Sequence, residues 1–96
     1  MCKVVNTISK NIDIFDLFTK VYVFGSSLND DKYQNDVDLL LVYKIYSKEI
    51  SDEKNSINSF FENLLNLPID LTVLSDEELK ETKFLEKIFP NYKRLK

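Results

Sequence analysis

Two acidic residues at the start of an apolar segment are the part of the sequence best suited to chemistry. Asp36 and Asp38 are followed directly by the apolar residues 39–43. In a strand, residues two apart point to the same face, so the two carboxylates would project together, with Cα atoms about 6.5 Å apart. Neighbouring carboxylates repel each other and are costly to desolvate, and a shared divalent cation removes both problems. Asp36 and Asp38 are therefore candidate magnesium ligands, and solvated residues at the start of a strand are the alternative.

A glycine lies at the end of a second apolar segment, Val21–Phe24. Gly25 is the only glycine in the sequence, and Ser26 and Ser27 follow it. A single glycine at this point indicates a backbone that turns sharply or is closely approached. Serine hydroxyls can cap a short helix, and the N–H groups at a helix start favour phosphate. Gly25, Ser26 and Ser27 are therefore candidate phosphate-binding residues, although an ordinary strand-to-helix turn would show the same pattern.

The order of these motifs resembles a known superfamily. A strand, Gly-Ser, about ten polar residues, Asp-x-Asp and a buried strand are typical of nucleotidyltransferases related to DNA polymerase beta. The chain is most similar to the minimal nucleotidyltransferases, and the resemblance covers roughly residues 15–89. The family has a third carboxylate on a later strand, and Asp70, in the segment Pro68–Leu74, fits it. An edge-strand aspartate or a salt-bridge partner is the alternative for Asp70.

The resemblance implies a mechanism and a set of cofactors. Asp36, Asp38 and Asp70 would be the catalytic residues and would bind two Mg²⁺ ions. Gly25, Ser26 and Ser27 would hold the phosphates of ATP, whose AMP would be transferred to a hydroxyl group. Small members of the family are often paired with HEPN-type toxins in toxin–antitoxin modules. The implied partner is therefore a HEPN-like toxin or a second copy of the chain, with the acceptor hydroxyl on the partner and the chain acting as its antitoxin.

The sequence departs from the family pattern after the Gly-Ser pair. Asn29 and Asp30 stand where a basic residue and a second glycine are usual, another acid, Asp31, follows them, and Lys32 offsets only part of that negative charge. This departure keeps open a catalytically weak or inactive domain that binds and occludes its partner. A free-standing transferase acting on a small molecule or an RNA end is a third reading.

Apolar spacing predicts the elements that position these residues. An apolar stripe predicts a helix within Met1–Lys20, and Ser51 is the expected cap of a second helix that ends near Asn66. Ser75 to Glu78 has the spacing of a capping box at the start of a third helix. Strands one and two are expected to be antiparallel, whereas the helix between strands two and three implies a parallel pair. The expected fold is a single α/β (α+β) domain over residues 1–96 with a mixed three-stranded sheet and packed helices, and with strands at 21–24, 37–43 and 69–74. The tail at 91–96 is basic with one aromatic residue. It is expected to be frayed, and contact with a nucleotide or a partner is the alternative.

Composition limits the classes of function. The chain has 96 residues with a net charge of −3, which argues against general binding of nucleic acid. Histidine is absent, so a Ser-His-Asp triad, a Cys-His pair and a His-liganded zinc site are excluded. Cys2 is the only cysteine, and neither a signal peptide nor an apolar run long enough to span a bilayer is present. We therefore expect a cytoplasmic protein without disulfides.

Overall fold

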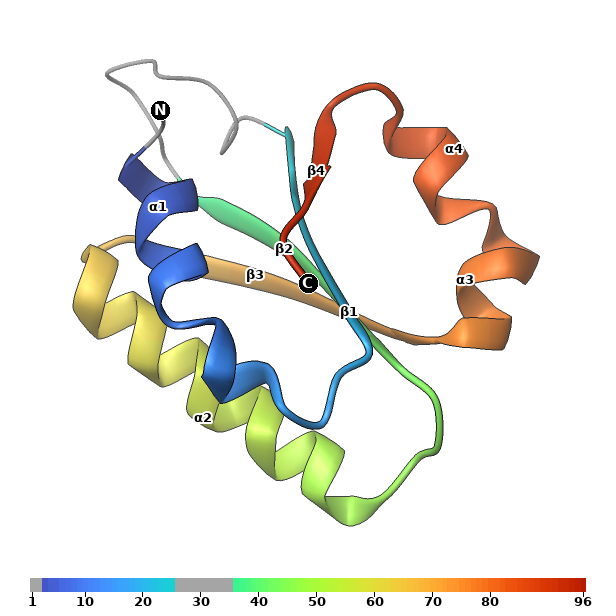
Figure 1. The fold of residues 1–96 in the computed structure, drawn as a ribbon, viewed down its shortest axis with the longest axis horizontal. Coiled ribbons are helices and arrows are strands. Elements are labelled where there is room, and N and C mark those ends of the chain that lie inside the picture. Colours follow the sequence, from blue (N-terminus) through green and yellow to red (C-terminus); the bar gives the residue numbers. More distant parts are fainter. Residues whose placement is uncertain (1–2, 26–35) are drawn as a thin grey trace.

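The sheet that was predicted to carry the acidic residues is present, and it has one strand more than expected. The computed structural model describes residues 3–25 and 36–96. Strand β1 pairs antiparallel with β2 and with β4, and β2 pairs parallel with β3, as the sequence predicted for the first three strands. The sheet order is β3-β2-β1-β4 (Figure 1), with bounds β1 (Lys20–Phe24), β2 (Val37–Tyr43), β3 (Ile69–Ser75) and β4 (Tyr92–Arg94).

Strand β2 is covered on both faces, which explains its unbroken apolar run. Its residues 39–42 are all fully buried. Leu39 and Leu41 belong to the core cluster shared with α1 (Lys3–Lys10) and α2 (Lys48–Leu65). The intervening Leu40 and Val42 pack on the other face, against α3 (Asp76–Thr82) and α4 (Phe84–Ile88). Figure 1 shows these two pairs of helices on opposite sides of the sheet.

The N-terminal helix is shorter than the predicted range Met1–Lys20. Helix α1 ends at Lys10, and a separate 3-10 helix, η1 (Ile12–Phe15), follows. The Asn11 side chain donates a hydrogen bond from Nδ2 to the carbonyl of Thr7 (2.8 Å), so a polar side chain satisfies a carbonyl in the last turn of the helix. The helix therefore ends locally, and the apolar stripe continues through a second, tighter turn.

Helix α2 starts earlier than predicted. It spans Lys48–Leu65, with Ser47 as the N-cap, whereas Ser51 is exposed inside the first turns. At the other end Asn66 is left-handed (φ 56°) and its N–H donates to the carbonyl of Glu62, as expected at a helix C-terminus.

In the part of the chain that the structure describes, no helix is both long and apolar enough to cross a membrane.

The single helix that was predicted after Ser75 is broken in two. Lys83 is left-handed (φ 54°) and separates α3 from α4. The break places Phe84 edge-on against Phe24 of β1, with ring centroids 5.5 Å apart. Both short helices thereby cover the same face of the sheet.

The prediction of a frayed tail at residues 91–96 is wrong. Tyr92–Arg94 form β4 on the free edge of β1. The Leu95 N–H donates to the carbonyl of Val21 (2.7 Å), and Leu95 packs against the core cluster of α1 and α2. Backbone pairing and burial of Leu95 therefore hold this segment in place.

The predicted capping box at the start of α3 is confirmed. The Ser75 hydroxyl accepts a hydrogen bond from the Glu78 N–H, and the Glu78 carboxylate accepts one from the Ser75 N–H, both 3.0 Å long. These bonds hold the pKa of Glu78 below its ordinary value. The box fixes the turn between β3 and α3.

We predict that Ser75→Ala destabilises the domain by about 1 kcal/mol, because one N–H at the start of α3 loses its acceptor. Urea unfolding of both proteins at neutral pH measures the difference. Ser51→Ala is the matched control, since Ser51 lies within α2 and alanine favours a helix interior. An equal loss of stability in the two variants would contradict the assignment of the cap.

Candidate functional site

One row of residues crosses all four strands near one end of the sheet. Asp38 is the Cα partner of Phe24 on β1 and of Asp70 on β3, and Phe24 is also the partner of Tyr92 on β4. Side chains of residues directly opposite each other share a face of the sheet. It is the face covered by α3 and α4, because Leu40, two residues beyond Asp38, packs there. The row therefore places two carboxylates and two aromatic rings along one line.

The three predicted carboxylates meet at the β2 and β3 end of this row. Asp36 immediately precedes β2, and its two-residue spacing from Asp38 gives it the same side. Burial raises the pKa of Asp38 above its ordinary value, and the negative charges of Asp36 and Asp70 raise it further. Both neighbours are thus near enough for their charges to act on Asp38. The structure therefore places Asp36 and Asp70 on either side of Asp38, within reach of its charge.

These carboxylates lie at the same end of β2 and β3, but they are not close enough together to form a complete metal site. Within residues 3–25 and 36–96, no three side chains of the His, Cys, Asp or Glu type are grouped closely enough to hold a metal ion. Asp70 is exposed and Asp38 is partly exposed, which leaves room for movement and for water. The donor set fits Mg²⁺, which takes carboxylate oxygens and keeps several of its waters.

Gly25 meets both conditions that the sequence analysis attached to it. Its φ of 69° lies in the left-handed region, and a Cβ atom at this position would be 2.8 Å from Oδ2 of Asp38. The turn at Gly25 therefore closely approaches the carboxylate of Asp38. The Gly25 N–H donates to the carbonyl of Asn91 (2.9 Å), so this donor already has an acceptor. Ser26 and Ser27, and the substituted positions Asn29, Asp30 and Asp31, lie outside the described residues.

The aromatic half of the row was not among the predicted site residues. Tyr92 packs edge-on against Tyr22, with 5.7 Å between the ring centroids. The Phe89 ring also lies edge-on to Tyr92, with 6.4 Å between the centroids. Phe89 is 69% exposed although it is a large apolar side chain. The one signal in the sequence was an aromatic residue within the basic segment 91–96, which alone does not indicate a strand.

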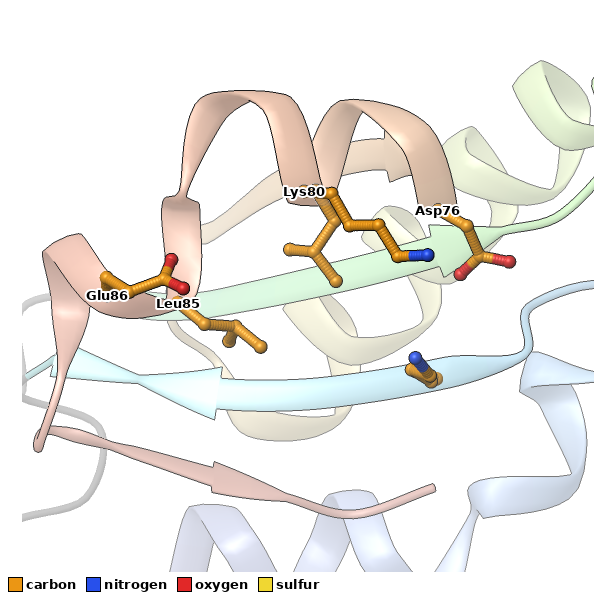
Figure 2. Close-up of a pocket in the computed structure, with 6 residues that line it drawn as sticks. Asp76, Lys80, Leu85 and Glu86 are labelled. Carbon is orange, nitrogen blue, oxygen red and sulfur yellow. The ribbon is translucent and has the colours of Figure 1, made fainter.

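Two hollows lie beside α4. One, of about 290 Å³, is lined by Leu85, Glu86, Phe89 and Tyr92 and is next to the row. The other, of about 380 Å³, shares Leu85 and Glu86 but extends toward the start of β1, away from the carboxylates. Figure 2 shows Asp76 and Lys80 of α3 and Leu85 and Glu86 of α4 around it, and none of the predicted site residues lines it; the lining is Lys20, Asp76, Leu79, Lys80, Leu85 and Glu86.

We predict that Gly25→Ala costs more stability than a left-handed backbone alone explains. The backbone term is about 1–2 kcal/mol, and the contact with the Asp38 carboxylate adds about 1–3 kcal/mol of overpacking. In an Asp38→Ala background only the backbone term remains. Urea unfolding of the four proteins of this double-mutant cycle measures the difference, and an equal cost in both backgrounds would show that Gly25 and Asp38 do not approach each other.

We predict that Asp38→Asn raises the melting temperature at pH 7 in the absence of divalent cations. The raised pKa means that ionisation of Asp38 lowers stability as the pH rises from its ordinary pKa of 3.8. The increase in melting temperature caused by Asp38→Asn should therefore become smaller as the pH falls toward 3.8. Asp13→Asn, at an exposed position on η1, is the control and should give no comparable gain. A variant less stable than the wild type at pH 7 would contradict the prediction.

Comparisons with known proteins identify the family and the fold. The family model described as "Nucleotidyltransferase domain" matches residues 2–95. A chain in the solved structure of a tri-AMPylated Shewanella oneidensis HEPN toxin in complex with MNT antitoxin has a similar fold, with a TM-score of 0.62 and 18% identity. The similarity covers 97% of this chain and 69% of that one. No curated protein matches the sequence. The resemblance inferred from the motifs is confirmed, and the chain belongs to the nucleotidyltransferase domain family.

Proposed function

We propose that this domain is a Mg²⁺-dependent nucleotidyltransferase that transfers AMP from ATP to a hydroxyl group of a partner protein. Family membership supports the reaction class. The observation that carries the proposal is the pairing of Asp38 with Asp70 across β2 and β3, beside Asp36. Three carboxylates on one sheet edge are the donor set that this chemistry needs.

Each carboxylate has a role in the proposed reaction. Asp36 and Asp38 would hold Mg²⁺, and Asp70 would complete the site and accept the proton of the attacking hydroxyl. The bound metal would neutralise phosphate charge and lower the pKa of that hydroxyl. The hydroxyl oxygen forms a bond to the α-phosphorus as the bond to the β-phosphate oxygen breaks, and pyrophosphate leaves. The protein contributes positioning and charge neutralisation and forms no covalent intermediate.

We propose that the acceptor is a HEPN-type toxin and that transfer neutralises it. The support is the similar fold found in the complex of a tri-AMPylated HEPN toxin with MNT antitoxin. Because the toxin of that complex carries AMP, a toxin of this class can be an acceptor.

Two observations favour a second candidate function, in which the domain binds its partner without transferring a nucleotide. The Gly25 N–H, a candidate phosphate donor, is engaged by Asn91. Asp30 and Asp31 add negative charge to the segment after the Gly-Ser pair. Both features weaken phosphate binding at this turn, and an occluding domain needs no triphosphate.

We predict that labelled ATP and Mg²⁺ lead to label on a co-purified HEPN-type partner. Asp36→Asn should lower the rate of labelling by about a hundredfold or more, because a charge that acts directly on the reacting groups is lost. Removal of divalent cations with a chelator should have the same effect. Gel analysis of the labelled partner, with mass spectrometry of the modified residue, measures the transfer.

Asp52→Asn, at an exposed position on α2, is the matched control for this experiment and should label the partner at the wild-type rate. Tight association of the two proteins without any label would support the occluding domain. Label on a small molecule or an RNA end would replace the protein acceptor by another substrate.

A further inference from the structure

We propose that the hollow formed by Leu85, Glu86, Phe89 and Tyr92 binds the adenine base of the nucleotide. This inference rests on the proposed function, since it names the part of the site that would select ATP. The hollow measures about 290 Å³, close to the lower end of the range of about 300–1,000 Å³ for small-molecule sites. Such a volume suits a flat ring system better than a larger ligand.

The position of the hollow relative to the carboxylates is set by strand register. Tyr92 and Asp38 are both Cα partners of Phe24, on the two strands that flank β1. Neighbouring strands lie about 4.8 Å apart, so Tyr92 and Asp38 are about 10 Å apart along the row. A nucleotide has its base at one end and its phosphates at the other. With the base beside Tyr92, the phosphates would extend past the turn at Gly25, at the end of β1, toward Asp38.

The chemistry of the lining matches a base with an amino group. Phe89 has 69% of its surface exposed, which leaves its ring available for stacking. Aromatic side chains stack on bases with a substantial gain in affinity. Among the described lining residues Glu86 alone is charged, and its carboxylate can accept a hydrogen bond from the exocyclic amine of adenine. Uracil has no such amine and would leave that acceptor without its donor.

The hollow is also tied to the turn at Gly25. The Asn91 carbonyl that accepts from the Gly25 N–H lies between Phe89 and Tyr92 in the chain. The aromatic wall and the turn beside Asp38 are thus held by the same short connection. A base seated on this wall would be at a fixed distance from the carboxylates.

Binding of adenosine, which has no phosphates, tests the hollow separately from the metal site. In a nuclear magnetic resonance titration without Mg²⁺, adenosine should shift the signals of Leu85, Phe89 and Tyr92, and uridine should shift them less. Phe89→Ala should weaken adenosine binding about five- to a hundredfold. Phe60→Ala, which removes an exposed ring from α2, is the control and should bind as the wild type does. Glu86→Gln is a conservative change at an exposed position, and it should reduce the difference in affinity between adenosine and uridine.

A second measurement separates this inference from the proposed function. With Mg²⁺ present, Phe89→Ala should weaken ATP binding but leave inorganic tripolyphosphate binding unchanged. If Phe89→Ala left ATP binding unchanged, or weakened the binding of ATP and of tripolyphosphate equally, the adenine site would be overturned. The proposed transferase function would not be affected by that result. Adenosine binding at the hollow with no binding of tripolyphosphate would retain the base site and remove the proposed function. Adenosine shifts confined to other residues, or none at all, would overturn the base site directly.

Discussion

Packing on both faces of β2 is the constraint on which the candidate site depends. Four consecutive side chains of this strand are fully buried, and burial of each is worth about 1.5–3 kcal/mol. That burial holds Asp38 at the strand start although its charge is disfavoured there by desolvation and by two neighbouring carboxylates. If β2 slipped by one residue, Asp38 would move to the other face of the sheet and lose its alignment with Asp70. The core therefore fixes where the chemistry can take place.

The site is built from locally unfavourable parts. Gly25 adopts a left-handed backbone beside a carboxylate oxygen, and Asp38 carries a raised pKa. Such features are expected where a protein is arranged for binding rather than for stability. Divalent metal and nucleotide, which the family typically uses, would relieve the repulsion among the carboxylates. A stabilising change at Asp38 and a loss of function would then have the same physical origin.

The sequence was sufficient for the centre of the fold but not for its edges. The unbroken apolar run after Asp38 predicted a buried strand, the helix before Ile69 predicted a parallel neighbour, and the register of the two strands brings Asp70 beside Asp38. The break at Lys83 could not be predicted, because lysine has no preference for a left-handed backbone. Strand β4 has only three residues, two of them exposed and basic, so its pairing with β1 and not its own pattern makes it a strand. The start of α2 was misplaced for a related reason, since Ser47 makes no side-chain capping bond and either nearby serine suits the first turn.

The hydrogen bond from Gly25 to Asn91 joins the end of β1 to the segment just before β4. During synthesis β1 and β2 are made well before residue 91, and a small domain generally folds as a unit. The turn that adjoins the acidic edge therefore gains its acceptor only after α4 has been made and the following segment has returned to β1. A polypeptide interrupted before that point would carry the three aspartates with an unfinished turn beside them. Completion of the site is in this way coupled to completion of the sheet.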